Sequence, residues 1–142
     1  MKIVITHPNS KSIASNDEQI VPLSELSAIM LSSCESIHLG DSMDFIPFHQ
    51  REKLLFMASK RLKYGGILTL SGSDAKSLAS QIYHNNISIK QTNTSLYDGR
   101  LSIDHITNVA RQLQKLDLTI IDEKLDNLYF SIKATRKNSN EQ

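Results

Sequence analysis

The residues best suited to chemistry are a histidine and an aspartate three positions apart, His38 and Asp41. They follow a short apolar segment, residues 35–39, that has the composition of a β-strand and is closed by Gly40. A histidine has a near-neutral pKa, so His38 can act as a general base at such a place. The plainer interpretation is a loop histidine near a turn aspartate, with no chemical role.

Other patterns of chemical interest are missing or have a structural explanation. The five histidines show no metal-ligand spacing, and the single cysteine, Cys34, excludes an intramolecular disulfide and a cysteine-based zinc cluster, so no metal is predicted. The chain contains no nucleophile elbow and no phosphate loop. Residues 71–74, Ser-Gly-Ser-Asp, can offer backbone donors to an anion or cap a helix, and capping alone explains them.

The bulk composition predicts one small domain. The chain has 142 residues, so we expect a single α/β domain over residues 1–135 and a disordered polar tail over residues 136–142. The 16 Lys and Arg balance 15 Asp and Glu, which indicates no nucleic-acid or membrane partner. The lone cysteine and the shortness of the apolar run at residues 3–5 favour a cytoplasmic protein.

Hydrophobic periodicity predicts strands that alternate with helices. Ser102 is the expected cap of the best amphipathic helix, which carries Ile103 to Leu113. The alternation argues for a mainly parallel sheet covered on both faces, ended by an antiparallel hairpin. The expected strands are residues 2–6, 20–23, 35–39, 67–70, 87–89, 118–121 and 128–134, and the expected helices are residues 24–31, 47–62, 75–84 and 103–113.

The stretch Arg61–Gly72, RLKYGGILTLSG, predicts a helix end followed by a buried strand. Lys60, Arg61 and Lys63 crowd the last turn, where cations meet the negative end of the helix dipole. Gly65 is expected to supply the left-handed residue just past the helix.

These elements resemble the class I, Rossmann-like S-adenosylmethionine-dependent methyltransferases, in a shortened and diverged form. Residues 36–47 resemble the family's fourth strand and the loop after it, and RLKYGG resembles its common R-L-K-P-G-G turn, with Tyr64 in place of proline. Residues 101–136 resemble its sixth and seventh strands. The resemblance covers Glu35 to Arg136 and implies a Rossmann-like three-layer sandwich, with a site at the carboxyl ends of the strands.

The amino-terminal part departs from the family pattern. There the first strand ends in a glycine-rich turn that lets the cofactor approach the backbone, whereas residues 6–10 here are Thr-His-Pro-Asn-Ser, and the first glycine of the chain is Gly40. Residues 10–19 lack the apolar periodicity of the expected helix, and Asp17 and Glu18 do not align convincingly with the family's ribose-binding acid. If a cofactor binds, the resemblance implies these contact residues: Thr6, His7, Asn9, Leu39 and Gly40.

Three functional hypotheses follow. The leading one is a methyltransferase-like domain that has lost the usual cofactor loop, binds no cofactor and acts as a binding or assembly module. The alternative is an active S-adenosylmethionine-dependent methyltransferase with an atypical loop, using His38 or Asp41 near the methyl acceptor. The third is a sheet-edge partner in a larger complex, because the last strand carries Tyr129, Phe130 and Ile132 and needs cover from its own helix, from a protein partner or from a second copy.

Overall fold

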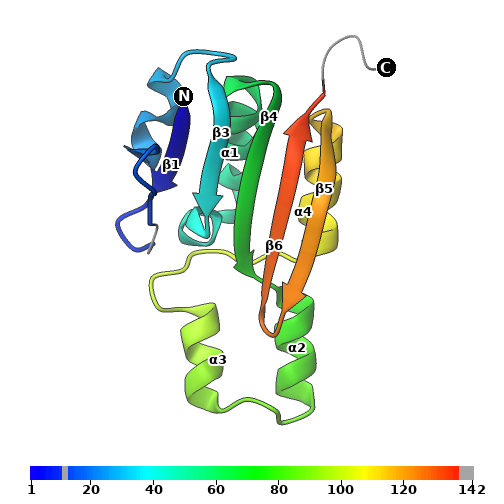
Figure 1. Ribbon diagram of the computed structural model, residues 1–142. Coiled ribbons are helices and arrows are strands. Elements are labelled where there is room, and N and C mark those ends of the chain that lie inside the picture. Colours follow the sequence, from blue (N-terminus) through cyan, green and yellow to red (C-terminus); the bar gives the residue numbers. More distant parts are fainter. Residues whose placement is uncertain (11–12, 138–142) are drawn as a thin grey trace.

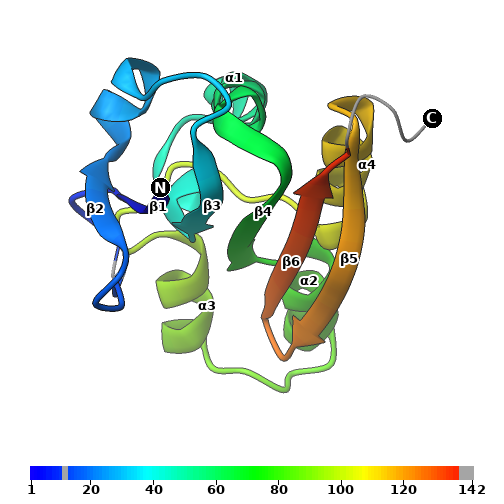
Figure 2. The same cartoon turned by 45° about the horizontal axis from the view of Figure 1, so that its top comes forward.

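A computed structural model of the chain describes residues 1–10 and 13–137. It contains a six-stranded sheet in the order β2-β1-β3-β4-β6-β5, with β2 beside β1 at one edge (Figure 1, Figure 2). The strands are β1 (Lys2–Thr6), β2 (Gln19–Pro22), β3 (Cys34–Gly40), β4 (Leu62–Ser73), β5 (Leu118–Asp126) and β6 (Tyr129–Arg136). The α-helices are α1 (Phe48–Arg61), α2 (Ala75–Tyr83), α3 (Ile89–Leu96) and α4 (Ile106–Lys115), and the 3₁₀ helices are η1 (Leu23–Ala28) and η2 (Ser42–Phe45).

The sheet confirms the predicted α/β architecture. Strands β2, β1, β3 and β4 are parallel, whereas β6 pairs antiparallel with both β4 and β5 to form the carboxyl-terminal hairpin. The chain passes from β1 to β2 on one side and continues to β3 and β4 on the other. The strand order therefore reverses between β1 and β3, and ligands of open α/β sheets bind at such a switch point.

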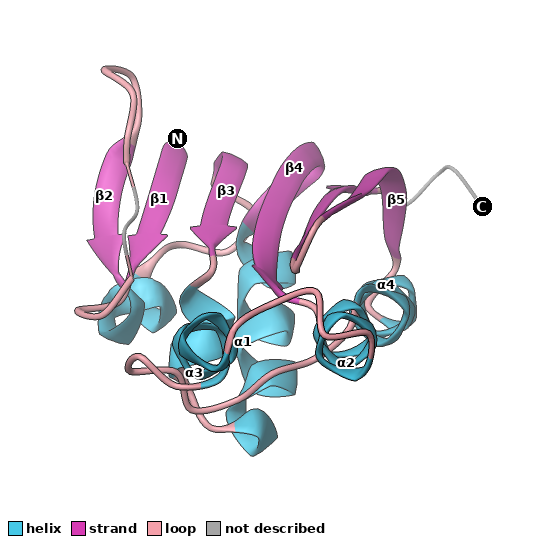
Figure 3. Ribbon diagram, turned by 90° about the horizontal axis from the view of Figure 1, so that it is seen from below, coloured by secondary structure: helices cyan, strands magenta, loops and turns pink. Residues whose placement is uncertain are grey.

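The described helices gather on one side of the sheet (Figure 3), so the expected cover of both faces, a three-layer sandwich, is wrong for the described residues. Burial alternates accordingly: Ile37 and Leu39 of β3 are fully buried in the core beneath α1, whereas His38 between them is half-buried on the other face. On that other face, which we call the open face, residues 13–18 form a loop (Figure 3). Among the described residues no helix joins β1 to β2, so the shortening falls on the layer that would cover the open face.

Two local predictions were wrong. Residues 87–89 are not a strand, because Ser88 opens α3: its hydroxyl accepts from the Gln91 amide (3.1 Å), and Gln91 Oε1 accepts from the Ser88 amide (2.9 Å). Ser102 does not cap α4; His105 does, through Nδ1 and the Asn108 amide (3.3 Å). The hydroxyl of Ser102 instead donates to the carbonyl of Ile46 (2.7 Å).

The RLKYGG turn also differs from its prediction. Helix α1 ends at Arg61 and the chain runs directly into β4, where Gly65 (φ 82°) lies within a bulge between the pairs Cys34–Leu62 and Ser36–Ile67. A Cβ on Gly66 would lie 2.9 Å from the carbonyl oxygen of Cys34, so the close approach of β3 requires glycine there. The two glycines therefore shape the strand rather than end the helix.

Arg136 closes the end of α1 from the last strand. Its Nη1 donates to the carbonyls of Leu62 (2.7 Å) and Lys60 (3.4 Å). Arg136, where we placed the start of the tail, is thus the last residue of β6, and residues 138–142 lie outside the described residues.

None of the helices in the described part of the chain is long and apolar enough to cross a membrane.

Candidate functional site

The switch point between β1 and β3 is flanked by the loops that follow these two strands. His7, after β1, stacks on Phe45 of η2 with 5.6 Å between ring centroids and 15° between planes. Ser10 donates from its hydroxyl to Oδ1 of Asp41 (2.6 Å). The two loops therefore contact each other directly across the place where a ligand of such a sheet is expected.

Arg100 extends into this crevice from the segment between α3 and α4. Its Nη2 lies 3.6 Å from Oδ2 of Asp41, and its Nε lies 3.4 Å from Oδ2 of Asp44. The guanidinium carbon is 5.1 Å from the centroid of the Phe45 ring, a cation–π distance. Because the Arg100 side chain is only 12% exposed, it fills the crevice rather than covering its rim.

The backbone around Arg100 is also fixed in place. The amide of Leu101 donates to the carbonyl of Asp44 (2.7 Å), and the amide of Ser102 donates to the same oxygen (3.2 Å). Gly99, with φ 84°, lies so close to Asn9 that an added Cβ would be 3.4 Å from its side chain. The segment 99–102 is therefore held between the loops after β1 and β3.

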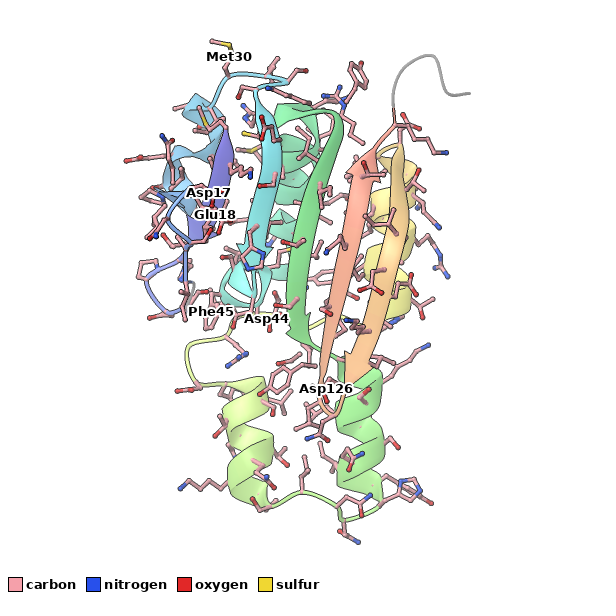
Figure 4. All side chains as sticks on the ribbon, viewed as in Figure 1. Asp17, Glu18, Met30, Asp44, Phe45 and Asp126 are labelled. Carbon is pink, nitrogen blue, oxygen red and sulfur yellow. The ribbon has the colours of Figure 1, made fainter. Side chains whose placement is uncertain are left out.

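Asp44 is the centre of this network (Figure 4). It is 1% exposed, and it accepts from Arg51 Nη2 at Oδ1 (3.0 Å) and from the Ser73 amide at Oδ2 (2.9 Å). Burial raises the pKa of Asp44, an effect that the Ser73 amide, Arg51 and Arg100 oppose only in part. Arg51 is also buried and donates from Nε to the Ser102 hydroxyl (2.7 Å).

A second hollow lies next to this crevice on the open face. It has a volume of about 400 Å³, and we call it the open-face pocket. His38 lines it, and its Nδ1 hydrogen-bonds Thr69 Oγ1. The described residues that line it are Ile13, His38, Gly40, Asp41, Ser71, Gly72 and Tyr129.

Comparison with known proteins finds relatives in structure alone. No protein-family model and no curated protein sequence matches the chain. A SAM-dependent methyltransferase from Methanosarcina mazei matches 92% of this chain and 73% of its own length, with a TM-score of 0.64 and 14% identity. An O-methyltransferase family protein from Burkholderia thailandensis matches 87% of this chain but 37% of its own length, with a TM-score of 0.62 and 12% identity.

A third match adds a bound ligand. The 1,6-didemethyltoxoflavin-N1-methyltransferase of Burkholderia thailandensis, solved with its substrate and S-adenosylhomocysteine, matches 85% of this chain and 52% of its own length, with a TM-score of 0.58 and 14% identity. The chain has the fold of the class I methyltransferases. It spans about a third to a half of the length of the two Burkholderia proteins.

The methyltransferase fold brings several predicted site residues together. His38, Gly40 and Asp41 line the open-face pocket, whereas His7 and Asn9 lie at the crevice and Thr6 ends β1. Leu39 is different, because its side chain is fully buried in the core on the helical side of the sheet.

The cofactor features that the family places in the amino-terminal half are not reproduced by the described residues. Asp17 precedes β2 instead of ending it, and it pairs with Lys2 at the surface (2.9 Å). Strand β2 ends at Pro22. The first acidic residue after this strand is Glu25, in the first turn of η1.

Other predicted roles are resolved by local contacts. Asp74 caps α2 by accepting from the Ser77 amide (2.9 Å), and it also accepts from Ile106 at the start of α4 (2.8 Å), so the capping interpretation is confirmed. Phe130 and Ile132 are 2% exposed beneath the helices, which confirms the core explanation for them. Among the described residues no group of three metal-ligating side chains is found.

Sequence reasoning missed Arg51, Asp44 and Arg100. Arg51 carried a readable signal, since it lies three and four positions before Leu54 and Leu55 and so belongs to the apolar face of its helix. Asp44 lies seven residues from Arg51 and 56 from Arg100. Nothing local in the sequence pairs Asp44 with Arg100.

Proposed function

We propose that this chain is a methyltransferase-like binding or assembly module of the cytoplasm that does not use S-adenosylmethionine as a cofactor. The observation that carries the proposal is the placement of Arg100 in the switch-point crevice, paired with Asp41 and Asp44 and stacked on Phe45. A cofactor has to enter a space that the chain's own side chains already occupy.

Electrostatics supports the same proposal. S-adenosylmethionine carries an ammonium, a sulfonium and one carboxylate, a net charge of +1, so unpaired carboxylates that face its two cationic groups favour its binding. Asp44 is already paired with Arg51 and Arg100, and Asp41 with Arg100 and Ser10. Displacing Arg100 would leave a buried carboxylate short of a partner, which is costly in a site of low dielectric.

The loop after β1 adds a steric reason. A cofactor that contacts the backbone there needs the space that glycine leaves, and residues 6–10 all carry side chains. Pro8 also lacks an amide hydrogen, so it cannot donate to a ligand. These features support a binding role that does not depend on the family's usual cofactor.

Calorimetric titration with S-adenosylmethionine and with S-adenosylhomocysteine tests the proposal. We expect no saturable heat from the wild-type chain. Arg100→Ala removes the side chain from the crevice, and we expect it to give no saturable heat either, because the loop after β1 keeps its side chains. Arg111→Ala, a change at an exposed arginine on α4, is its matched control. Saturable binding to the wild-type chain at micromolar strength would overturn the proposal.

An active S-adenosylmethionine-dependent methyltransferase is the second candidate. It is favoured by the meeting of His38 and Asp41 in the open-face pocket, where a methyl acceptor would find a base and a carboxylate. It requires cofactor binding through the atypical loop Thr6–Ser10. It predicts methyl transfer that His38→Ala or Asp41→Asn abolishes, and retained transfer in both variants would remove these residues from the mechanism.

A further inference from the structure

An exposed apolar surface lies at the end of the sheet opposite the crevice. We call it the amino-end patch and define it by Met30, Leu31, Phe56, Lys60 and Tyr64. Their side chains come from the turn before β3, from helix α1 and from the start of β4. The four apolar members are between 50% and 76% exposed, and Met30 projects from the end of the molecule opposite Asp44 (Figure 4). Large apolar side chains grouped in this way mark interaction sites more often than scattered ones.

Named contacts hold the members of the patch together. The amide of Ser32 donates to the carbonyl of Lys60 (3.0 Å), which fixes the Met30–Leu31 turn against the end of α1. Arg136 donates to the Ser32 hydroxyl (3.2 Å), and its guanidinium lies 4.4 Å from the centroid of the Tyr64 ring. Lys60 Nζ lies 5.5 Å from the centroid of the Phe56 ring. These contacts place the Met30–Leu31 turn, the Phe56 ring and the Tyr64 ring at the same end of the sheet.

The charge of this surface is positive. Lys60 and Lys63 carry exposed ammonium groups, and Lys63 forms a long, exposed ion pair with Glu35 (3.9 Å). Arg61 is engaged elsewhere, because its three nitrogens donate to the carbonyls of Leu26, Ser27 and Met57. Lysines that flank exposed aromatic and aliphatic side chains favour a ligand that is both acidic and apolar.

We infer that the amino-end patch docks an acidic, apolar segment of a partner protein. The inference deepens the proposed function, because it names the surface and the partner chemistry of an assembly module. A symmetric dimer through this patch would bring the same two lysines of each copy to one interface, which like-charge repulsion disfavours. An anionic membrane is less suitable, because stable attachment takes a cluster of about four to eight exposed cations, and the exposed ammonium groups named here are two, those of Lys60 and Lys63.

A synthetic amphipathic peptide is the probe. It places leucine at the i, i+3, i+4 and i+7 positions of a helix of about 14 residues with glutamate elsewhere, and its counterpart carries lysine in place of glutamate. We expect the glutamate peptide to shift the amide resonances of Met30, Leu31, Phe56 and Tyr64 in ¹⁵N-labelled protein saturably. We expect the shifts to weaken with added salt, because the flanking charges are exposed.

Two double variants on the same helix make the test specific. Phe56→Ser with Lys60→Glu should weaken binding of the glutamate peptide at least about tenfold, equivalent to about 1.4 kcal/mol. Phe48→Ser with Lys53→Glu, a matched exposed pair at the other end of α1, should leave it unchanged. Urea unfolding of both variants checks that each is folded.

The outcomes are separable. Binding of the glutamate peptide that the first double variant loses and the second retains supports the inference. Equal binding of the two peptides, binding only to vesicles of anionic lipid, concentration-dependent self-association through the patch, or no binding at all would overturn it. The cofactor titration is independent, since micromolar cofactor binding would overturn the proposed function while leaving this surface to be judged by the peptides.

Discussion

The switch-point crevice and the open-face pocket share one carboxylate, Asp41, and differ in everything around it. In the crevice, Asp41 lies beside Arg100 and Ser10, and Phe45 and His7 stack behind them. In the open-face pocket, the same side chain faces an open volume of about 400 Å³. The two hollows therefore differ in how fully their polar groups are already satisfied.

This difference identifies which polar groups at the ends of the strands are still available to a ligand. In α/β sheets the switch point is the usual ligand site, but a site exists only where groups are left to meet a ligand. In the crevice, Asp41 and Asp44 are already paired with Arg100, and Asp44 also with Arg51. The open-face pocket keeps a histidine, a carboxylate, a serine and a tyrosine in contact with solvent.

The largest expected effect comes from removing the carboxylate at the centre of the crevice. Asp44→Ala leaves the buried Arg51 without its ionic partner, so we expect a loss of about 3–5 kcal/mol in the free energy of unfolding. Ser71→Ala, on the pocket side, should change it by less than about 0.5 kcal/mol. Urea denaturation measures both changes. Equal losses of unfolding free energy would mean that the crevice contributes no more to stability than the open-face pocket does.

A methyl group at Gly72 tests how tightly the chain is packed between the crevice and the open-face pocket. A Cβ there would lie 2.8 Å from Oδ1 of Asp44 and 3.2 Å from the Phe130 ring. Because both neighbours are buried, we expect Gly72→Ala to cost about 1–3 kcal/mol in unfolding free energy. Thermal or urea unfolding at one pH measures this cost. An unchanged unfolding free energy would show that the side chains of Asp44 and Phe130 can move to make room for the methyl group.

Emptying the crevice sharpens the comparison further. Arg100→Ala removes the contacts of one mostly buried guanidinium, so we expect a loss of about 1–3 kcal/mol in unfolding free energy. We also expect that the variant still fails to bind S-adenosylmethionine, because the loop after β1 keeps its side chains. Micromolar binding that appears only in this variant would show that Arg100 alone closes the site.

The smallest expected effect is a dependence of stability on pH. Burial raises the pKa of Asp44 in the folded state, so between its ordinary value and the raised value the folded chain binds more protons than the unfolded chain. The contribution of Asp44 to stability is therefore largest at low pH and falls as the pH rises above about 4.

Comparison with Asp44→Asn isolates this contribution. The exposed Asp17 and Glu18 have lowered pKa values, because of the Lys2 and Ser15 hydrogen bonds respectively, and contribute with the opposite sign. They are common to both proteins and cancel in the difference. Urea unfolding at several pH values should show the stability advantage of wild type over the asparagine variant shrinking as pH rises, and a growing advantage would contradict the assignment.

Much of the fold was predictable because it rests on local patterns. Strand β1 was predicted at its observed bounds, and Asp74 was recognised as a cap. The missed helix α3 had a readable signal in Ser88 and Gln91, but the β-branched Ile87 and Ile89 drew the prediction toward a strand. A capping box supplies two hydrogen bonds at once, which outweighs a weak strand propensity.

The candidate site was predictable only in part. His38 and Asp41 stand three residues apart at the end of one strand, so their neighbourhood could be read from the sequence. Arg100 joins Asp44 across 56 residues, and segment 99–102 is placed by hydrogen bonds to the carbonyl of Asp44. Such a contact depends on the packed chain, and one sequence carries no local trace of it.

Titration of S-adenosylhomocysteine into ¹⁵N-labelled wild-type protein tests the central claim most directly. The amides of Gly40, Asp41, Gly99 and Arg100 surround the crevice and report any ligand that enters it. We predict that these resonances stay in place even at a large excess of the ligand. Saturable shifts of these resonances at micromolar S-adenosylhomocysteine would contradict the claim that the chain's own side chains close the cofactor site.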